Sequence, residues 1–102
     1  MKKSLEPAAD GDQFVFQLFV AGGEFHSKEA KVNLTELCES HLKGHYTIQI
    51  IDVFESYTIA LENGIFLTPA LIKVSPRPRR TIFGNLSDTE EVLTALELTG
   101  GE

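Results

Sequence analysis

The 102-residue chain is poor in sulfur and lacks tryptophan, with one cysteine, Cys38, and one methionine. A single cysteine cannot form an intramolecular disulfide, so folding does not depend on an oxidising compartment. We therefore expect a protein of the reducing cytoplasm.

No long hydrophobic run is present either. Residues 1–12 lack the apolar stretch of a secretory signal or a membrane anchor, so we expect a flexible tail there and no membrane partner. The hydrophobic fraction of 42% and the charged fraction of 24% are those of an ordinary globular domain. We place one domain at residues 13–99 and a short C-terminal tail at 100–102.

Positive charge is scarce, because nine Lys and Arg residues stand against fifteen Asp and Glu residues, for a formal net charge of −6 at pH 7. Duplex binding needs many basic contacts with phosphate, so a nucleic-acid partner is not expected. Four of the nine basic residues nevertheless fall within eight positions, which predicts a docking surface for an acidic counterpart. A solvated face is the alternative. The four are Lys73, Arg77, Arg79 and Arg80.

Residues that could carry catalysis or hold a metal form no recognised motif. His26, His41 and His45 lack the spacing of zinc ligands, so we expect neither a metal nor another cofactor. Cys38 falls on the apolar stripe of a predicted helix, where a free cysteine packs as a small hydrophobe. Isolated carboxylates such as Asp52 have no neighbour that would orient a substrate, so no enzymatic activity is expected.

The first half of the domain reads as strand, helix, strand. Phe14–Val20 and Tyr46–Val53 are aromatic and β-branched runs that predict two buried strands. Between them, apolar residues recur every three or four positions from Ser27 to a stop at Gly44, which predicts a helix and a parallel crossover. The apolar stripe consists of Ala30, Leu34, Leu37, Cys38 and Leu42.

The second half contains shorter signals. Ser56 can cap a short helix, and residues 71–74 and 81–83 predict an antiparallel hairpin. Ser87, followed by Glu90 at capping-box spacing, predicts a final helix. The order βαβαββα indicates an α/β protein with a mixed four-stranded sheet, which is the thioredoxin-like arrangement.

The thioredoxin-like fold raises one enzymatic alternative, a thiol oxidoreductase. Such an enzyme needs paired cysteines between the first strand and the first helix, where a helix N-terminus lowers the pKa of the nucleophile. This chain has Gly22–Ser27 there, without a cysteine. We therefore regard redox chemistry as the least favoured function.

Five segments carry a resemblance to a known family: Leu18–Gly22, Tyr46–Val53, Thr68–Lys73, Pro78–Arg80 and Gly84–Asp88. In order and spacing they resemble the KaiB clock-protein family, and the likeness extends over about residues 14–98. The resemblance implies a non-enzymatic partner of KaiC, a hexameric ATPase of the RecA type; in cyanobacteria this pair belongs to the circadian oscillator. A KaiA-like protein and the pathway of a clock-associated histidine kinase are further implied partners.

The resemblance also implies that the second half can refold. Members are known for a thioredoxin-like monomer that binds the ATPase and for a βαββααβ ground state that forms tetramers, so a homodimer or homotetramer is a further expectation. Two such packings can differ by only a few kcal/mol. Residues of the expected switching region are Pro69, Pro76, Pro78, Gly84, Asn85, Ser87 and Asp88.

The sequence departs from the common KaiB pattern at several positions. Asn85 stands where aspartate is usual, Phe83 where a smaller aliphatic residue is usual, and Phe54–Tyr57 lacks a proline often found there. Pro69 occupies the place of the cis-proline of thioredoxin-like folds, although a trans proline at a strand edge is also compatible with the sequence.

We expect the second strand and the following helix to dock on the ATPase, since a sheet edge offers backbone hydrogen bonds. Two alternatives keep the same scaffold: a stress-response regulator paired with a KaiC homologue, and a sensory module like the input domain of a clock-associated histidine kinase. The expected partner-binding residues are Asp52, Glu55, Tyr57, Lys73, Arg77, Arg79 and Arg80.

Overall fold

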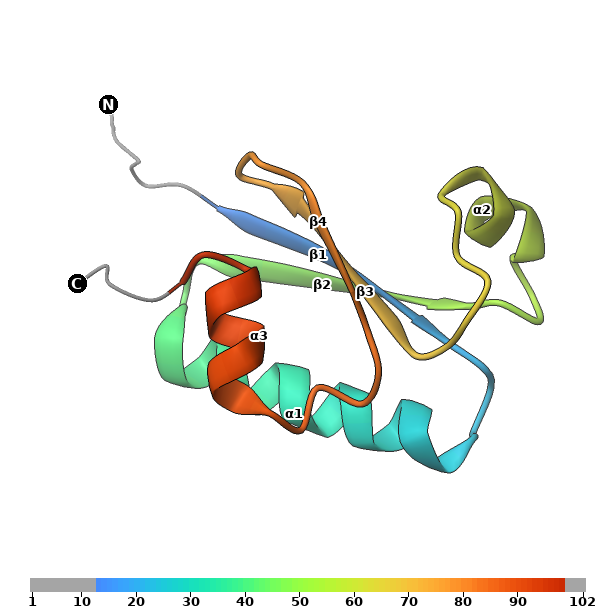
Figure 1. The fold of residues 1–102 in the computed structure, drawn as a ribbon, viewed down its shortest axis with the longest axis horizontal. Helices are drawn as coiled ribbons and strands as arrows, with labels where there is room; N and C mark the ends of the chain where they lie inside the picture. The colour runs from blue at the N-terminus through green and yellow to red at the C-terminus, as the bar shows by residue number, and fades with distance from the viewer. Residues whose placement is uncertain (1–12, 99–102) are drawn as a thin grey trace.

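The computed structural model describes residues 13–98. The predicted tails at 1–12 and 100–102, and residue 99 at the end of the predicted domain, lie outside the described residues. Within them the elements follow the predicted order βαβαββα (Figure 1). They are β1 (Phe14–Val20), α1 (Phe25–His41), β2 (Tyr46–Asp52), α2 (Tyr57–Glu62), β3 (Ala70–Ser75), β4 (Arg80–Phe83) and α3 (Thr89–Ala95).

The strands form one mixed sheet in the order β2-β1-β3-β4. β1 runs parallel to β2 and antiparallel to β3, and β4 returns antiparallel to β3. This topology confirms the predicted thioredoxin-like fold and differs from the βαββααβ alternative. None of the helices in residues 13–98 has both the length and the apolar character needed to cross a membrane.

The two faces of the sheet are covered unequally. α1 and α3 lie together on one face, here called the α1/α3 face, while α2 stands apart at one end of the sheet (Figure 1). Alternating side chains of β1 divide between the faces, with Leu18 in the α1/α3 cluster and Phe19 in the α2 cluster. The α1/α3 cluster contains Phe16, Leu18, Val20, Ala30, Leu34, Leu37, Cys38, Leu42, Leu71, Leu86, Val92 and Leu96.

Helix α1 begins two residues before the predicted start at Ser27. The carboxylate of Glu24 accepts hydrogen bonds from the backbone N–H groups of His26 and Ser27, both at 3.0 Å. These bonds satisfy donors that the first helical turn leaves without intrahelical partners. The predicted apolar stripe is buried, and Gly44 adopts a positive φ of 82° just beyond the helix.

Strand β2 was predicted to be buried, and this prediction is wrong. β2 is an edge strand in which only Ile51 is buried, and the side chain of Ile50 is 45% exposed. The reason is topological, because β1 takes the centre of the sheet and pairs with both β2 and β3. On the α2 face, where Ile51 is buried, Thr47 and Gln49 remain exposed.

The two short helices are capped differently from the prediction. Ser56 does occupy the N-cap position of α2, but its side chain makes no capping hydrogen bond. At α3 the cap is Asp88 rather than Ser87, and its carboxylate accepts from the backbone N–H of Glu91 at 3.1 Å. The backbone N–H of Ser87 instead donates to the side chain of Asn85 at 3.0 Å.

Strands β3 and β4 form the predicted hairpin, with Cα partners running from Ala70 and Phe83 to Lys73 and Arg80. The peptide bond from Thr68 to Pro69 is cis, which is one of the two forms compatible with the sequence. The bonds that precede Pro76 and Pro78 in the hairpin turn are also cis.

Candidate partner-binding surface

Large apolar side chains are exposed around α2. This helix has six residues and buries only Ala60, so its remaining apolar side chains face solvent. The loops on either side expose aromatic rings as well, and that of Phe66 is 77% accessible. Concentrated apolar exposure of this kind is typical of a surface that binds another molecule. We call it the α2 surface, and it comprises Phe54, Tyr57, Leu61, Phe66 and Leu67.

Most of this surface was not foreseen from the sequence, which singled out only Tyr57. Phe66 and Leu67 follow Gly64 as an apolar pair without the period of a helix or the alternation of a strand. That lack of pattern is the signal that could have identified them as exposed loop residues.

The predicted acidic residues beside α2 have different roles. Asp52 is partly buried, and its side chain accepts hydrogen bonds from the backbone N–H groups of Phe54 at 2.9 Å and Gly22 at 3.3 Å. Asp52 therefore shapes the turn that presents Phe54, whereas Glu55 in the same turn is exposed. Of the two carboxylates, Glu55 is the one available to a partner.

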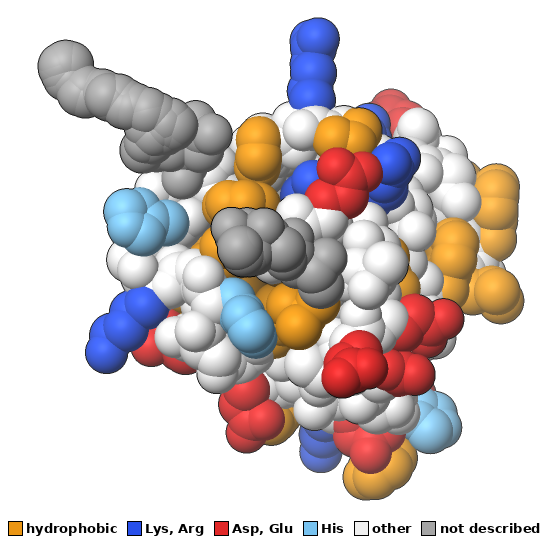
Figure 2. Space-filling model, turned by 60° about the vertical axis from the view of Figure 1, so that its left-hand side comes forward, with side chains coloured by type: hydrophobic (Ala, Val, Ile, Leu, Met, Phe, Trp, Pro, Cys, Tyr) orange, Lys and Arg blue, Asp and Glu red, His pale blue; other side chains and the backbone are white. Residues whose placement is uncertain are grey.

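Three arginines of the hairpin are exposed, and one of them joins the hairpin to α2. Arg79 donates from Nη2 to the side-chain oxygen of Asn63, at the end of α2, over 2.5 Å. Arg80 pairs with Glu97 at 2.6 Å, and Arg77 lies exposed in the turn. In Figure 2, Lys and Arg side chains gather near the top of the view and Asp and Glu side chains toward the lower right. The charge is thus unevenly distributed over this face of the molecule.

Lys73 does not belong to this exposed patch, which corrects the prediction. Its side chain is only 2% exposed, and Nζ donates to the backbone oxygen of Leu96 at 3.1 Å. Burial lowers the pKa of Lys73, an effect that Glu97 opposes and Arg80 reinforces. Lys73 shares the α1/α3 face with Leu71 because side chains two positions apart on a strand point the same way. Strand alternation could have revealed this.

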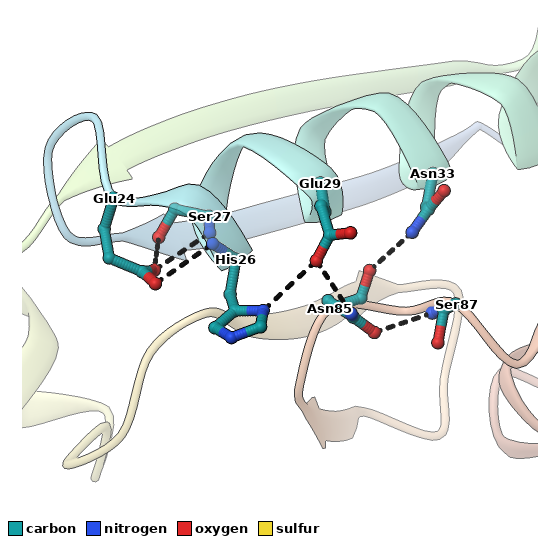
Figure 3. A network of polar contacts seen from close by, with 7 residues as sticks. All are labelled: Glu24, His26, Ser27, Glu29, Asn33, Asn85 and Ser87. Atoms are coloured by element: carbon teal, nitrogen blue, oxygen red, sulfur yellow. Dashed lines mark hydrogen bonds and ion pairs between the residues drawn. The ribbon is translucent and has the colours of Figure 1, made fainter.

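Asn85, in the expected switching region, connects the β4–α3 loop to α1 (Figure 3). Its side-chain NH2 donates to Glu29 at 3.0 Å, and its backbone oxygen accepts from the side chain of Asn33 at 2.8 Å. His26 contacts the same oxygen of Glu29 at 3.1 Å. An aspartate at position 85 could not donate and would place a second carboxylate against Glu29. We call these contacts the Asn85 clasp.

The remaining residues of the switching region lie just before β3, in the hairpin turn and in the loop after β4. Gly84 adopts a φ of 113°, a backbone conformation that side chains rarely allow, and this explains a glycine directly before Asn85. Pro76 and Pro78 lie in the hairpin turn, and Pro69 is buried just before β3.

The charge at the N-terminus of α1 and the pKa of Cys38 are both unlike those of a redox-active cysteine site. The carboxylate of Glu24 occupies the N-terminus of α1, where its hydrogen bonds, first with His26, lower the pKa of Glu24. A thiolate would be repelled there. Burial raises the pKa of Cys38 to about 12, whereas a nucleophilic cysteine needs a lowered pKa. In residues 13–98, no three His, Cys, Asp or Glu side chains come together as metal ligands would.

In a comparison with known protein families, the model of the KaiB domain matches residues 17–98. The chain belongs to the KaiB family. A circadian clock oscillator protein KaiB of Prochlorococcus marinus (strain NATL2A) is 44% identical over 85 residues, covering 83% of this chain and 79% of that protein. The circadian clock protein KaiB3 of Synechocystis is 37% identical over 89 residues, covering 87% of each chain. The likeness confirms the family predicted from the five segments.

Solved structures similar to this KaiB-family chain share the thioredoxin-like fold. The N-terminal domain of Synechococcus elongatus SasA superposes with a TM-score of 0.72 at 23% identity, covering 99% of each chain. Mitochondrial thioredoxin 3 of Saccharomyces cerevisiae has a TM-score of 0.68 at 20% identity, covering 85% of this chain and 80% of that one. At such low identity these likenesses establish the fold alone.

Proposed function

We propose that this KaiB-family chain is a non-enzymatic regulator that binds a KaiC-type hexameric ATPase through the α2 surface. The observation that carries the proposal is the exposure of several large apolar side chains around α2, next to the arginine side of the β3–β4 hairpin. The proposed partner follows from membership of the KaiB family. Within that family, the thioredoxin-like form is the one that binds the ATPase, and this chain has that topology. The same chemistry would serve circadian timing or a related regulatory system.

Affinity and orientation would come from different parts of this surface. Exposed aromatic side chains such as Tyr57 and Phe66 supply large buried areas at an interface and commonly dominate its energy. Arginines at the rim mainly speed association and fix orientation. The complementary site on the ATPase would therefore be an apolar groove bordered by carboxylates facing Arg79.

The test measures binding of the full chain to a KaiC homologue in the presence of ATP or ADP. Tyr57→Ala and Phe66→Ala should each weaken binding at least about tenfold, as expected for an aromatic residue at the centre of an interface. Val32→Ala is the matched control, because Val32 is an exposed apolar residue on α1 at 56% accessibility. Equal affinities for all three variants would contradict the proposed surface.

Charge reversal tests the contribution of the hairpin. The double variant Arg79→Glu with Arg80→Glu should bind more slowly, with a smaller dependence of the association rate on salt than the unaltered protein. Arg80→Glu alone is the control, because it breaks the ion pair with Glu97 without altering the contact of Arg79 with Asn63. An unchanged association rate in the double variant would remove the hairpin from the interface.

Further partners follow from the family resemblance. A KaiA-like protein and a component of a clock-associated histidine kinase pathway are candidates to join or compete with the ATPase. Cys38 is the one cysteine of the sequence, so no reduction of insulin disulfides by the purified chain is expected. Measured turnover in that assay would contradict a function that consists of binding alone.

A further inference from the structure

The three arginines of the β3–β4 hairpin differ in what holds their side chains. Arg80 forms an ion pair with Glu97 at 2.6 Å, so its charge is already compensated within the chain. Arg77 is exposed in the turn, and within residues 13–98 its side chain makes no hydrogen bond or ion pair. Arg79 donates to the neutral side chain of Asn63 at 2.5 Å, and no carboxylate of the described residues pairs with it. Arg79 is thus held in place while its charge stays uncompensated in this part of the chain.

The end of α2 that carries Asn63 is firmly attached to the domain. The N–H of Gly64 donates to the oxygen of Leu61 at 3.0 Å, which is one of the two bonds of a Schellman motif. The N–H of Ile65 makes the second bond, to the oxygen of Ala60 at 2.9 Å. Both Ile65 and Ala60 belong to the buried α2 cluster. Although most of α2 is exposed, the backbone at Asn63 is therefore fixed.

Both ends of the Asn63 side-chain amide are used. Its nitrogen donates to the backbone oxygen of Ile59 at 2.8 Å, and its oxygen accepts from Arg79. A primary amide has one donor end and one acceptor end, so a single orientation of the side chain satisfies both contacts. Asn63 therefore orients Arg79 without neutralising it, whereas the carboxylate of Glu97 neutralises Arg80.

We propose that Asn63 is a positioning residue that presents Arg79 to a carboxylate of the bound partner. This role rests on the proposed function, because the partner is the ATPase that binds the α2 surface. A guanidinium and a carboxylate can form two parallel hydrogen bonds, so the position of Arg79 determines how the partner is oriented. Ordering this side chain before binding avoids an entropy loss that corresponds to about two- to tenfold in affinity. Arg79, and not Arg80, is then the arginine that recognises the partner.

Mobility of the arginine side chains tests the positioning without any partner. In the full chain, NMR relaxation of the guanidinium Nε should show that Arg79 is more ordered than Arg77. Asn63→Ala should raise the mobility of Arg79 to that of Arg77 and leave Arg80 unchanged. The variant should fold, because the bonds that end α2 are made by the backbone. If Arg79 is as mobile as Arg77 in the unaltered chain, Asn63 does not position it.

A double-mutant cycle tests whether Asn63 acts through Arg79 when the ATPase binds. Asn63→Ala should weaken the affinity for a KaiC homologue about two- to tenfold. In the Arg79→Ala background the same substitution should have no further effect, because a residue that acts only through another loses its role when that residue is absent. Equal weakening in both backgrounds, or none in either, overturns the proposal. Arg77→Ala is the matched control and should weaken binding less than Arg79→Ala.

Asn63→Asp separates the position of Arg79 from its charge. Aspartate keeps an oxygen that can accept from Arg79, but its negative charge compensates the guanidinium as Glu97 does for Arg80. The association rate should therefore fall and depend less on salt. Thr35→Asp is the matched control, since it adds the same charge at an exposed position of α1. Equal changes in the two variants would show that only net charge matters and would overturn the proposal.

Failure of this role and failure of the proposed function give different results. An unaltered chain that does not bind the ATPase contradicts the proposed function, while the NMR comparison still decides whether Asn63 holds Arg79. Binding that depends on Tyr57 and Phe66 but not on Asn63 would keep the α2 surface and overturn the role of Asn63.

Discussion

The α1/α3 face of the sheet buries a cluster of twelve residues under a helix of seventeen residues and α3, whereas the α2 face buries a cluster of six under a helix of six. Buried apolar area is the main source of folding free energy. The two faces of the sheet therefore contribute differently to stability and to the exposed surface. One face holds the domain together, and the other leaves apolar side chains outside, where a partner can cover them.

The largest expected effect contrasts a buried and an exposed leucine. Leu34→Ala should lower the free energy of unfolding by about 2–5 kcal/mol, because it creates a cavity in the α1/α3 cluster. Leu61→Ala should change it by less than about 0.5 kcal/mol, because that side chain faces solvent on α2. Urea denaturation measures both values. Losses of similar size would show that the two faces contribute equally to stability.

Alkaline pH tests how well the α1/α3 face excludes water. The pKa of Cys38 is raised from 9.0 to about 12, so the folded chain keeps a proton that the unfolded chain releases. Stability from this thiol is complete below about pH 9 and is lost as the pH rises toward 12. Between pH 8 and pH 10 the free energy of unfolding should fall by roughly 1–2 kcal/mol.

The control for this titration is Cys38→Ala, which lacks the thiol but keeps every other titrating group. Tyr46, for example, has its pKa raised to about 12, chiefly by its hydrogen bond to Glu39, and it remains in both proteins. The decrease in unfolding free energy from pH 8 to pH 10 should be smaller in Cys38→Ala. Parallel pH profiles for the two proteins would mean that the thiol is solvated.

The smallest effect compares the caps of the short helices on the two faces. Asp88→Ala should destabilise the domain by about 1 kcal/mol, because the Asp88 carboxylate accepts from the N–H of Glu91 at the start of α3. Ser56→Ala should have little effect, since the Ser56 side chain makes no capping bond at α2. Thermal unfolding of both variants gives the comparison. A greater loss for Ser56→Ala would reverse the assignment of the caps.

The fold was largely predictable because its long elements carry strong patterns. The apolar stripe from Ala30 to Leu42 recurs at helical spacing over several turns, and the run Phe14–Val20 favours a strand on composition alone. The edge position of β2 was less accessible to sequence reasoning, since it depends on which strand takes the centre of the sheet. The alternating Thr47 and Gln49 were a local sign of one polar face.

The candidate surface was harder to predict than the fold. Phe54 and Phe66 lie in the loops on either side of α2 and are exposed, although phenylalanine is among the residue types most often buried. Ser87 and Asp88 are adjacent residues that can both cap a helix, so local sequence could not choose between them. Lys73 was misassigned because its charge was weighed without its position on the strand.

The Asn85 clasp also bears on the order in which the chain assembles. Asn85 and Glu29 are 56 positions apart, so their contact closes a long loop whose entropy must be lost before the hydrogen bond forms. Contacts of such high sequence separation slow folding. We expect β1, α1 and β2 to form early and to act as a template on which the loop after β4 is fastened last.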